Sequence, residues 1–344
     1  MPEQNNYMKR CMELALMGKG FVSPNPMVGC VIVYDGNIIG EGYHELFGGH
    51  HAEVNAIKSV KDQSLLKKAS LYVNLEPCSH WGKTPPCSNL IIEKGIPHVV
   101  IGCVDSYSKV AGRGIERLKL AGIAVDVNIL ESECKELNRR FFAFHEKQRP
   151  YIILKWAETK DGFIDIAPHL KESVKGLWIT NDLCRKIVHK WRADETAIMV
   201  GTNTAIIDNP SLTTRDWAGK SPIRFSIDKQ LKFPSQLHLL DNTIKTYIFT
   251  NKSTQNLKNV EYITQKDISV HTMINAMYNK GIESIIIEGG TKLLQSFIDQ
   301  NIWDEARVFI GNKVFKEGIK APRFDGIPSK SEMIEETILN YYLK

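Results

Sequence analysis

The order of strand-like and helix-like segments constrains the fold of this chain more than any other feature of its sequence. In the first half, apolar runs of strand length alternate with stretches of helix length, and short connections join them. The predicted helices cover residues 52–60, 87–94 and 114–121, and the predicted strands cover residues 70–75, 97–104 and 123–127. Such alternation requires crossover connections, so it predicts a mainly parallel sheet with helices on both faces.

A hairpin is predicted to open this sheet. Two strand-like runs, VGCVIV and NIIGEGY, flank the dipeptide Asp35-Gly36. Asp-Gly readily adopts the left-handed conformations that a two-residue turn between antiparallel strands needs. The turn therefore predicts that these two strands pair with each other.

The length of the chain predicts two domains, since 344 residues at about 150 residues per domain is close to two. A helix is expected over residues 131–148 and should end at Arg149-Pro150, because a residue before proline disfavours the helical conformation. We therefore place the domains at 1–149 and 150–344. The second part has strand-like runs separated by helical patterns, YIILKWAET, TAIMVG, PIRFSID, TYIFT and SIIIEGG, which predicts another α/β domain.

Composition excludes several classes of protein. The chain is 43% hydrophobic and 24% charged, as globular proteins are, and its apolar runs are far shorter than the roughly 18 residues of a membrane span. Its 44 basic and 39 acidic residues are spread along the sequence, which argues against a nucleic-acid partner. The start of the chain lacks a secretion pattern, and seven cysteines are an odd number, so we expect a cytoplasmic protein without a disulfide framework.

Three residues form a pattern typical of a catalytic zinc site. His51 stands at the start of a predicted helix, and Cys87 follows Pro85-Pro86 at the start of another, nine residues after Cys78. One imidazole and two thiolates leave the fourth zinc position for water. We expect the dipole of the second helix to favour the ionised form of Cys87.

Because of Glu53, the sequence predicts a deaminase and not only a metal site. A carboxylate two residues after the zinc histidine can take a proton from water and pass it to a ring nitrogen and a leaving amine, as in zinc nucleobase deaminases. The alternatives are a structural zinc site, or two buried cysteines and a surface histidine. The general deaminase pattern has two residues between the cysteines, whereas this chain has eight, so the loop is long enough to reach a substrate. Within that loop, His80 and Lys83 have the polarity to meet an anionic group.

In the second half, the clearest feature is a buried strand followed by two glycines. The strand Ser284–Ile287 leads to Glu288-Gly289-Gly290, and a helix is predicted from about Thr291. Backbone N–H groups at such a helix start suit an anion such as a dinucleotide pyrophosphate. The same pattern is typical of a tight turn, and no G-x-G-x-x-G is present. The residues alone therefore predict an α/β domain whose ligand is open.

Short motifs recur in order along nearly the whole chain. In the first half they are NPMVG (25–29), GEGYH (40–44), HAEV (51–54), EPCSH (76–80), GKTPPC (82–87) and VAGRG (110–114). In the second half they are DG (161–162), WIT (178–180), DNP (208–210), LT (212–213) with Arg215, and EGG (288–290). By these motifs the chain resembles the bacterial bifunctional riboflavin-biosynthesis deaminase/reductase family. It departs from the family's Asp-Pro-Asn-Pro turn at Asp105-Ser106-Tyr107-Ser108.

The resemblance implies a cytidine-deaminase-like three-layer α/β/α domain at 1–149 and a dihydrofolate-reductase-like α/β domain at 150–344. It implies zinc bound by His51, Cys78 and Cys87, with Glu53 as the catalytic proton carrier. The residues that would shape the deaminase pocket are Asn25, His44, His80, Lys83 and Asp105. Its substrate would be a diamino-pyrimidinone with a ribosylamino 5′-phosphate, which loses its ring 2-amino group as ammonia.

For the second domain, the resemblance implies NADPH-dependent reduction of the ribosyl group to a ribityl group. The residues that would bind NADPH are Ala157, Trp178, Thr204, Asp208, Gly290, Thr291, Lys292, Leu293, Leu294, Gln295 and Ser296. The residues that would bind substrate are Gly176, Arg192, Leu212, Arg215 and Glu288. Guanidinium groups suit phosphate because they bind it bidentately, although surface salt bridges are the commoner role of arginine. No acid or base is assigned in this half, because NADPH supplies the hydride.

Two other classes of function stay open. A tRNA-type adenosine deaminase with an accessory binding domain needs a basic, aromatic-bearing face in residues 151–344, and the sequence shows none. A structural zinc protein whose second domain mediates assembly would hold zinc without turnover. The resemblance itself implies a small phosphorylated pyrimidine as substrate, no nucleic-acid or membrane partner, and a homo-oligomer formed through the reductase domain.

Overall fold

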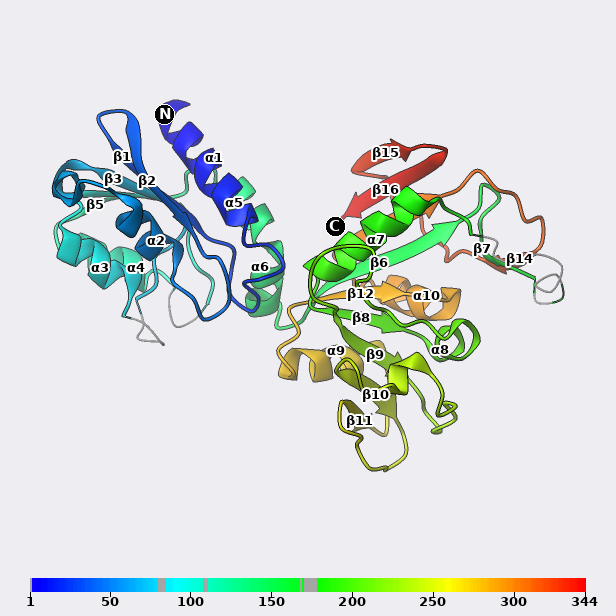
Figure 1. Cartoon of the computed structure of the whole chain (residues 1–344). Helices are drawn as coiled ribbons and strands as arrows, with labels where there is room; N and C mark the ends of the chain where they lie inside the picture. The colour runs from blue at the N-terminus through cyan, green and yellow to red at the C-terminus, as the bar shows by residue number, and fades with distance from the viewer. Residues whose placement is uncertain (1, 80–84, 108–110, 168, 170–177) are drawn as a thin grey trace. The chain divides into compact units, whose positions relative to one another are not determined.

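The computed structural model of the chain describes residues 2–79, 85–107, 111–167, 169 and 178–344. The chain divides into two compact units, Met1–Gln148 and Arg149–Lys344. Each unit has a sheet and a hydrophobic core of its own (Figure 1). Among the described residues, no helix is both long enough and apolar enough to cross a membrane.

The first unit is built on a sheet with the strand order β2-β1-β3-β4-β5 among its described residues. The strands are β1 (Gly29–Tyr34), β2 (Asn37–Tyr43), β3 (Ser70–Leu75), β4 (His98–Cys103) and β5 (Ala124–Asp126). The predicted hairpin is confirmed, with Asp35 and Gly36 at positive φ in its turn. The prediction of a mainly parallel sheet is wrong at β1, which pairs antiparallel with both β2 and β3. The reason is that the connection after β2 passes over β1, so β3 lies beside an antiparallel neighbour.

Helices cover both faces of this sheet (Figure 1). They are α1 (Pro2–Leu16), α2 (Ala52–Ser59), α3 (Cys87–Lys94), α4 (Arg113–Leu120), α5 (Glu131–Leu137), α6 (Arg139–Glu146) and the 3-10 helix η1 (Gln63–Lys68). Cys30 and Ile32 of β1 pack with α2, α3 and α4, whereas Val31 and Val33 pack with α1, α5 and α6. Strand residues alternate between faces, so β1 is apolar throughout. The unit is therefore the predicted three-layer α/β/α domain.

The single helix predicted over residues 131–148 is two helices, α5 and α6. They are separated at Asn138, whose φ is −103° and ψ is 23°. Its buried side chain bonds the backbone of Met27 twice, accepting from the N–H at 2.8 Å and donating to the carbonyl at 2.9 Å. A tertiary contact therefore interrupts a segment that is helical by its local sequence.

The second unit contains a sheet with the strand order β11-β10-β9-β8-β12-β6-β13-β16-β15 among its described residues. The strands are β6 (Tyr151–Glu158), β8 (Ala197–Val200), β9 (Ile223–Ile227), β10 (Thr246–Thr250), β11 (Val260–Thr264), β12 (Ser284–Glu288), β13 (Glu305–Ile310), β15 (Lys330–Ile334) and β16 (Thr337–Leu343). A separate pair consists of β7 (Phe163–Ile166) and β14 (Gly318–Lys320). The strands from β11 to β13 run parallel, and β16 is antiparallel to both β13 and β15.

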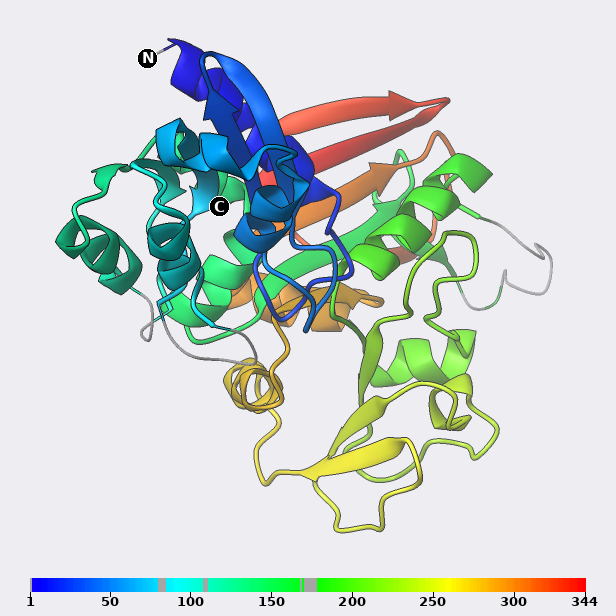
Figure 2. The ribbon, with the colours of Figure 1, turned by 60° about the vertical axis from the view of Figure 1, so that its left-hand side comes forward.

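Helices also lie on both faces of this sheet (Figures 1 and 2). They are α7 (Asp182–Asp194), α8 (Thr202–Asp208), α9 (Val270–Asn279), α10 (Thr291–Asp299) and the 3-10 helix η3 (His238–Leu240). Leu154 of β6 and Ile287 of β12 belong to the core formed with α9 and α10. On the other face, α7 packs through Trp191, whose ring lies 5.4 Å from that of Phe309 in β13.

The connections of the second sheet diverge between β8 and β12. After β8 the chain passes through α8 to β9, away from β12, whereas after β12 it passes through α10 to β13, beyond β6. In open parallel sheets, ligands bind at the carboxyl ends of the strands where connections diverge. The topology therefore places a binding site beyond Val200 and Glu288.

Candidate functional site

In the first unit, β2, β3 and β4 run in the same direction, so their carboxyl ends meet at one edge of the sheet. His51 is the N-cap of α2, Cys78 follows β3, and Cys87 is the first residue of α3. His51 Nδ1 lies 3.5 Å from Cys78 Sγ and 3.3 Å from Cys87 Sγ, and all three ligand atoms lie within 4.8 Å of one another. The fold thus assembles the predicted metal site between two helix starts.

These distances fit a zinc ion. Tetrahedral zinc with bonds of about 2.1 Å to nitrogen and about 2.3 Å to sulfur separates those ligand atoms by about 3.6 Å. Within the described part of the chain, the cluster has one histidine and two cysteines. Three protein ligands with a further position for water are typical of catalytic zinc, whereas structural zinc usually has four protein ligands.

The start of α3 provides a hydrogen bond to the other cysteine of the cluster. The Cys87 N–H donates to Cys78 Sγ at 3.3 Å. Hydrogen bonds from Cys87 and His51 hold the pKa of the Cys78 thiol well below its ordinary value despite burial. The pKa of the Cys87 thiol is raised by its hydrogen bond to Cys78 and by burial. The start of α3 therefore also stabilises the Cys78 thiolate, and ionisation of Cys87 as a metal ligand stays a prediction.

Glu53 lies in the first turn of α2 with its side chain buried. Burial raises the pKa of its carboxyl, and the nearby Cys78 charge raises it further. The Cys87 side chain, which lies within hydrogen-bonding reach, acts in the opposite sense. A proton-carrying group therefore lies beside the metal ligands, as the chemistry of a zinc deaminase requires.

Asn25 and His44 lie beside the zinc ligands. The His44 Nδ1–H donates to the His50 carbonyl at 2.9 Å, so His44 Nε2 accepts from the Asn25 amide at 3.0 Å. Burial lowers the pKa of His44, which keeps its ring neutral. The His44 ring meets that of His51 edge to face, with 5.5 Å between centroids. The structure thus brings these two predicted pocket residues to the metal site.

Asp105 follows β4 at the same edge of the sheet and is buried. Burial raises the pKa of its carboxyl to about 7, although a hydrogen bond from the Tyr107 N–H at 2.7 Å opposes the shift. The other two predicted pocket residues, His80 and Lys83, lie outside the described residues.

The sequence analysis did not single out Glu76, which holds the segment around Asp105 in place. Its buried carboxylate accepts hydrogen bonds of 2.8–3.2 Å from the N–H groups of Asp105, Gly112, Gly114 and Ile115. Glu76 is also two residues before Cys78, so one short segment supports both a metal ligand and the pocket wall. The signal in the sequence was the acid of the EPCSH motif.

In the second unit, the sequence analysis missed a lysine in the middle of β6. Lys155 is in register with Glu288 of β12, and both lie on the face that α7 covers. Burial lowers the pKa of Lys155, against the opposing effect of the Glu288 charge. Burial opposes ionisation of Glu288, but the charges of Arg192 and Lys155 outweigh it and hold the pKa of Glu288 below its ordinary value. The three side chains therefore form a partly desolvated charge cluster.

Arg192 is already engaged within the protein. It donates to Glu288 Oε2 at 3.0 Å and to the Thr213 carbonyl at 3.3 Å. Glu288 Oε1 and Arg192 Nε are buried without a partner among the described residues. A buried polar atom left unpaired costs about 1–3 kcal/mol, so these two atoms fit a ligand with hydroxyl and acceptor groups.

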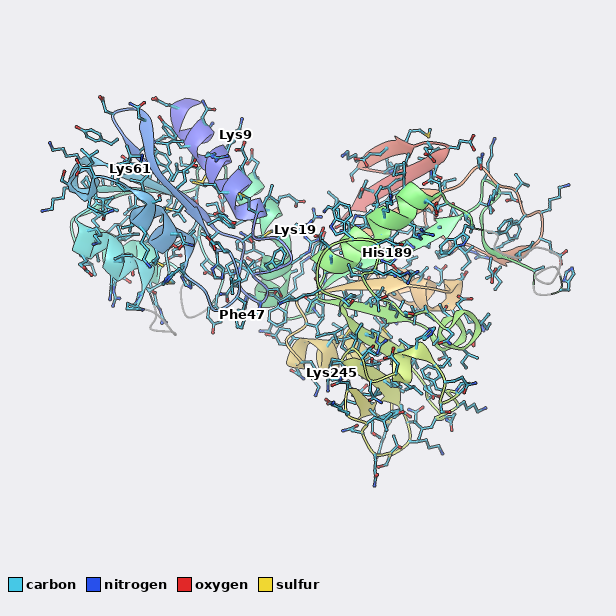
Figure 3. All side chains as sticks on the ribbon, viewed as in Figure 1. Lys9, Lys19, Phe47, Lys61, His189 and Lys245 are labelled. Atoms are coloured by element: carbon cyan, nitrogen blue, oxygen red, sulfur yellow. The ribbon has the colours of Figure 1, made fainter. Side chains whose placement is uncertain are left out.

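Leu212 and Arg215 lie in the loop between α8 and β9. Leu212 is buried and adopts a φ of 55°. Arg215 is exposed, and among the described residues its guanidinium makes no hydrogen bond or ion pair. Its backbone N–H donates at 3.1 Å to His189, the α7 residue labelled in Figure 3. Gly176, the remaining predicted substrate residue, lies outside the described residues.

Predicted NADPH-binding residues meet at the ends of β8 and β12. The Gly290 N–H donates to Thr204 Oγ1 of α8 at 3.1 Å. Gly289 has a φ of 115°, and a Cβ there would lie 2.9 Å from the same oxygen, so only glycine fits. The first N–H groups of α10 have no partner inside the helix, which suits the pyrophosphate of a dinucleotide.

Several other predicted NADPH-binding residues already have their side chains buried or hydrogen-bonded within the protein. Leu293 and Leu294 are part of the hydrophobic core, so their side chains are not available to a cofactor. The Ser296 hydroxyl donates to the Leu293 carbonyl, and the Gln295 side chain bonds Asp299 and the Arg323 backbone. The Thr291 hydroxyl likewise donates to the Lys320 carbonyl, whereas Lys292 is exposed. Ala157 lies near the end of β6, Trp178 is exposed beside Arg185, and Asp208 is exposed at the end of α8.

Comparison with known proteins agrees with these two sites. Residues 150–337 match the family described as the RibD C-terminal domain. Residues 1–103 match the cytidine and deoxycytidylate deaminase zinc-binding region. A zinc-binding deaminase domain and an NADPH-dependent reductase domain thus occur in one chain, with the His51, Cys78 and Cys87 cluster in the first.

Relatives match over most of their length. Riboflavin biosynthesis protein RibD of Aquifex aeolicus is 40% identical over 91% of this chain and 88% of its own, and that of Escherichia coli is 34% identical over 90% and 87%. The crystal structure of the Thermotoga maritima diaminohydroxyphosphoribosylaminopyrimidine deaminase/5-amino-6-(5-phosphoribosylamino)uracil reductase superposes with a TM-score of 0.90 at 35% identity, covering 99% of both chains. This chain therefore belongs to the RibD family of bifunctional deaminase/reductases of riboflavin biosynthesis.

Proposed function

We propose that the chain deaminates a diamino-pyrimidinone bearing a ribosylamino 5′-phosphate in its first unit and reduces the product with NADPH in its second. The product of the first step is the 5-amino-6-(5-phosphoribosylamino)uracil that the Thermotoga relative is named for. The observation that carries this proposal is the buried Glu53 carboxyl beside the cluster of His51, Cys78 and Cys87.

In the deamination, each residue of the first site has a distinct task. Zinc bound by the three ligands supplies a Lewis acid that makes water a better nucleophile at neutral pH. Glu53 carries the two protons that water loses one after the other, the first to the ring nitrogen and the second to the amine, which leaves as ammonia. Asn25 and His44 orient the pyrimidine ring, because their mutual hydrogen bond fixes the amide next to the metal site.

In the reduction, two hydrogens are added to the sugar, one as hydride and one as a proton. The residues at the ends of β8 and β12 would hold NADPH, which would supply the hydride for the sugar C1 carbon. Lys155 holds the proton and passes it to the ring oxygen as the bond between C1 and that oxygen breaks, so the oxygen becomes a hydroxyl of the ribityl chain. Its lowered pKa eases this transfer, and Glu288 Oε1 is available to accept from a sugar hydroxyl.

The substrate phosphate is bound by Arg215. Its guanidinium is exposed and has no partner among the residues that the structure describes, whereas Arg192 is held by Glu288 and the Thr213 carbonyl. A free guanidinium can bind a phosphate bidentately. Arg192 therefore orients Glu288, and Arg215 provides the charge that meets the phosphate.

A coupled assay on the full chain tests the proposal, with ammonia, NADPH oxidation and bound zinc measured on one preparation. Glu53→Gln should retain zinc but deaminate about 10²- to 10⁴-fold more slowly. Given the deaminated intermediate directly, the same variant should oxidise NADPH at the wild-type rate. Deamination by Glu53→Gln at the wild-type rate would contradict the role of Glu53. Bound zinc without turnover in either half-reaction would favour a structural metal site.

Two further statements stay predictions. Light scattering on the full chain would detect a homo-oligomer. The same measurement on a chain altered at the edge strand β15 would test whether the second unit forms the interface. Cytoplasmic residence is tested by cell fractionation with an antibody against the chain.

A further inference from the structure

The loop that carries Arg215 has, at Leu212, a backbone conformation that this residue type does not favour. It covers residues 209–216, between α8 and β9. Two of its non-glycine residues have positive φ, 38° at Asn209 and 55° at Leu212. Asparagine readily adopts this conformation at the end of a helix, as Asn209 does after α8, whereas for Leu212 it costs free energy and persists only where the surrounding structure holds it. The 209–216 loop must therefore be held from outside.

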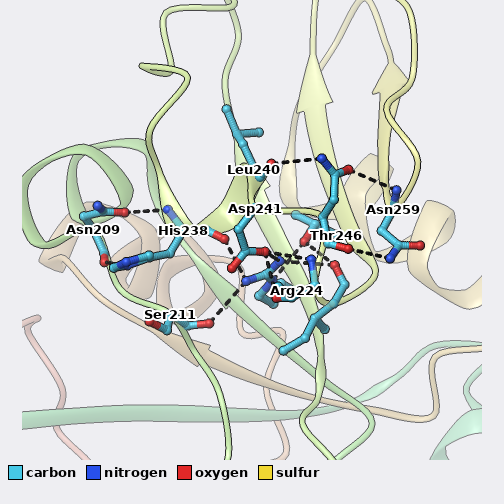
Figure 4. Close-up of polar contacts among 11 residues, drawn as sticks. Asn209, Ser211, Arg224, His238, Leu240, Asp241, Thr246 and Asn259 are labelled. Carbon is cyan, nitrogen blue, oxygen red and sulfur yellow. Dashed lines mark hydrogen bonds and ion pairs between the residues drawn. The ribbon is translucent and has the colours of Figure 1, made fainter.

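Residues outside the 209–216 loop form hydrogen bonds with every second residue of it, beginning at Asn209. Asn209 is bonded twice by His238, whose N–H donates to Asn209 Oδ1 and whose Nδ1–H donates to the Asn209 carbonyl, both at 2.7 Å. The Ser211 carbonyl accepts from the fully buried Arg224 at 3.4 Å (Figure 4). Further along the loop, Arg192 donates to the Thr213 carbonyl at 3.3 Å.

His189 of α7 provides the next contact, at Arg215 itself. Its ring is buried, and Nδ1 accepts from the Arg215 N–H at 3.1 Å and from the Asp216 N–H at 3.5 Å. Burial lowers the pKa of His189, and the nearby Arg192 charge lowers it further. The ring is therefore neutral, with its proton on Nε2, 3.5 Å from an Asp216 carboxylate oxygen that Arg185 also contacts at 3.0 Å.

This contact determines the direction in which the Arg215 side chain leaves the loop. Fixing the backbone N–H of a residue fixes its Cα–Cβ direction to within the freedom of one dihedral angle. The Arg215 guanidinium has no partner of its own among the described residues. Its position therefore depends on the backbone anchor and not on a salt bridge.

We propose that His189 is a positioning residue of the reductase, which holds the backbone of Arg215 so that the guanidinium meets the substrate phosphate. This rests on the proposed role of Arg215. His189 itself touches neither the substrate nor NADPH in this proposal, so its loss should weaken phosphate binding and leave hydride transfer intact.

The experiment compares three variants of the full chain in steady-state reductase assays. His189→Leu removes the acceptor, whereas His189→Asn keeps one, because the asparagine Oδ1 occupies the place of the imidazole Nδ1. Val188→Ala, next to it in α7, removes buried volume but no hydrogen-bond acceptor and is the matched control for packing. Deaminase activity of the same preparations reports on the first unit.

His189→Leu should raise KM for the phosphorylated substrate roughly tenfold, equivalent to about 1.4 kcal/mol, with kcat and KM for NADPH within twofold of wild type. His189→Asn should restore most of that KM, and Val188→Ala should leave it unchanged. The substrate without its phosphate should be turned over equally by His189→Leu and wild type. Equal KM values for His189→Leu and wild type would overturn the proposal, as would a loss confined to kcat.

Arg215→Ala separates failure of this proposal from failure of the proposed function. If Arg215→Ala raises KM for the phosphorylated substrate and His189→Leu does not, the positioning role is wrong and the role of Arg215 stands. If Arg215→Ala leaves KM unchanged, the phosphate site is elsewhere and both statements fail. If both single variants raise KM, the double variant should be no worse than Arg215→Ala, because the two residues act through one guanidinium.

Discussion

Lys155 lies in the middle of a buried parallel strand, where a charged residue needs a partner. It has Glu288 beside it in register, and Arg192 reaches the same carboxylate from α7. A lysine without a counter-charge there would be costly, because transfer of a charge from water to the protein interior is unfavourable. The arrangement therefore keeps an amine with a lowered pKa beside Glu288, where the proposed reduction needs a proton donor.

We expect Lys155→Met to slow NADPH oxidation about 10²- to 10³-fold with the deaminated intermediate, since general acid catalysis contributes about that much. Lys155→Arg, the matched variant, keeps the charge but should be nearly as slow, because a guanidinium does not release its proton near neutral pH. Single-turnover absorbance at the NADPH band measures both. Wild-type rates in Lys155→Met would assign the proton to another group.

At the scale of elements, the junction between β12 and α10 depends on the absence of a Cβ at Gly289, which leaves space for Thr204. Gly289 lets the backbone turn at positive φ while Thr204 of α8 approaches from the side. The Gly290 N–H completes the contact by donating to the Thr204 hydroxyl. The carboxyl ends of β8 and β12 are thereby held together at the edge where the connections diverge.

Gly289→Ala should raise KM for NADPH about tenfold and lower stability by about 1–3 kcal/mol, because the new Cβ meets Thr204 and the backbone is strained. Gly281→Ala is the control, since Gly281 also has positive φ, at 73°, but no atom lies within 4 Å of its added Cβ. Gly281→Ala should lower stability but leave KM for NADPH unchanged. Titration of NADPH fluorescence and urea denaturation distinguish the two effects, and equal NADPH affinity in both variants would contradict the crowding argument.

The connections around the amino end of β9 are held by one buried guanidinium. Arg224 is fully buried and bonds Thr246 Oγ1, Asp241 Oδ1 and the carbonyls of His238 and Ile244 (Figure 4). Burial alone would raise the pKa of Asp241, but hydrogen bonds from Arg224 and Thr243 outweigh it and lower that pKa to about 2. The carboxylate is therefore the counter-charge that a buried arginine requires.

Asp241→Asn should lower the stability of the second unit by about 2 kcal/mol at neutral pH, since it leaves the Arg224 charge uncompensated. The folded pKa of about 2 lies below the ordinary 3.8, so the carboxylate stabilises fully above pH 3.8 and less as pH falls toward 2. The difference between wild type and variant should shrink over that range in urea titrations followed by tryptophan fluorescence. Asp267→Asn, at an exposed acid, should show no such trend.

At the scale of the whole molecule, the two units have separate hydrophobic cores. The first packs around β1, β3 and β4, and the second around β6, β8 and β12. Each core belongs to a unit with its own ligand, zinc in the first and NADPH in the second. A ligand that binds one folded unit should therefore stabilise that unit alone.

Scanning calorimetry should show two transitions that respond to different ligands. Removal of zinc by a chelator should lower one transition by about 5 °C or more, and NADPH should raise the other by a similar amount. Cys78→Ser, which removes a zinc ligand, should make the first transition insensitive to the chelator. A single transition that moves with both ligands would show that the units unfold together.

Much of the fold was predictable because its signals are local. The start of α3 at Cys87 and that of α10 at Thr291 were predicted at the residues where they occur. The helix α1 was missed, although Tyr7, Met8, Cys11 and Leu14 recur at helical spacing, because the surrounding polar residues obscured the pattern. The strands β13, β15 and β16 were missed as well, since apolar runs near the end of the chain are short.

The sequence by itself determined the candidate metal ligands, the turn at Asp35-Gly36 and the glycine-initiated helix start, because spacing, turn conformation and capping depend on neighbouring residues. Only the tertiary structure decided which distant residues meet. It placed Lys155 beside Glu288 and the Arg215 N–H on His189. The physical reason is that strand register and helix docking are set by hydrogen bonding and packing between segments far apart in the chain, for which no local pattern carries a signal.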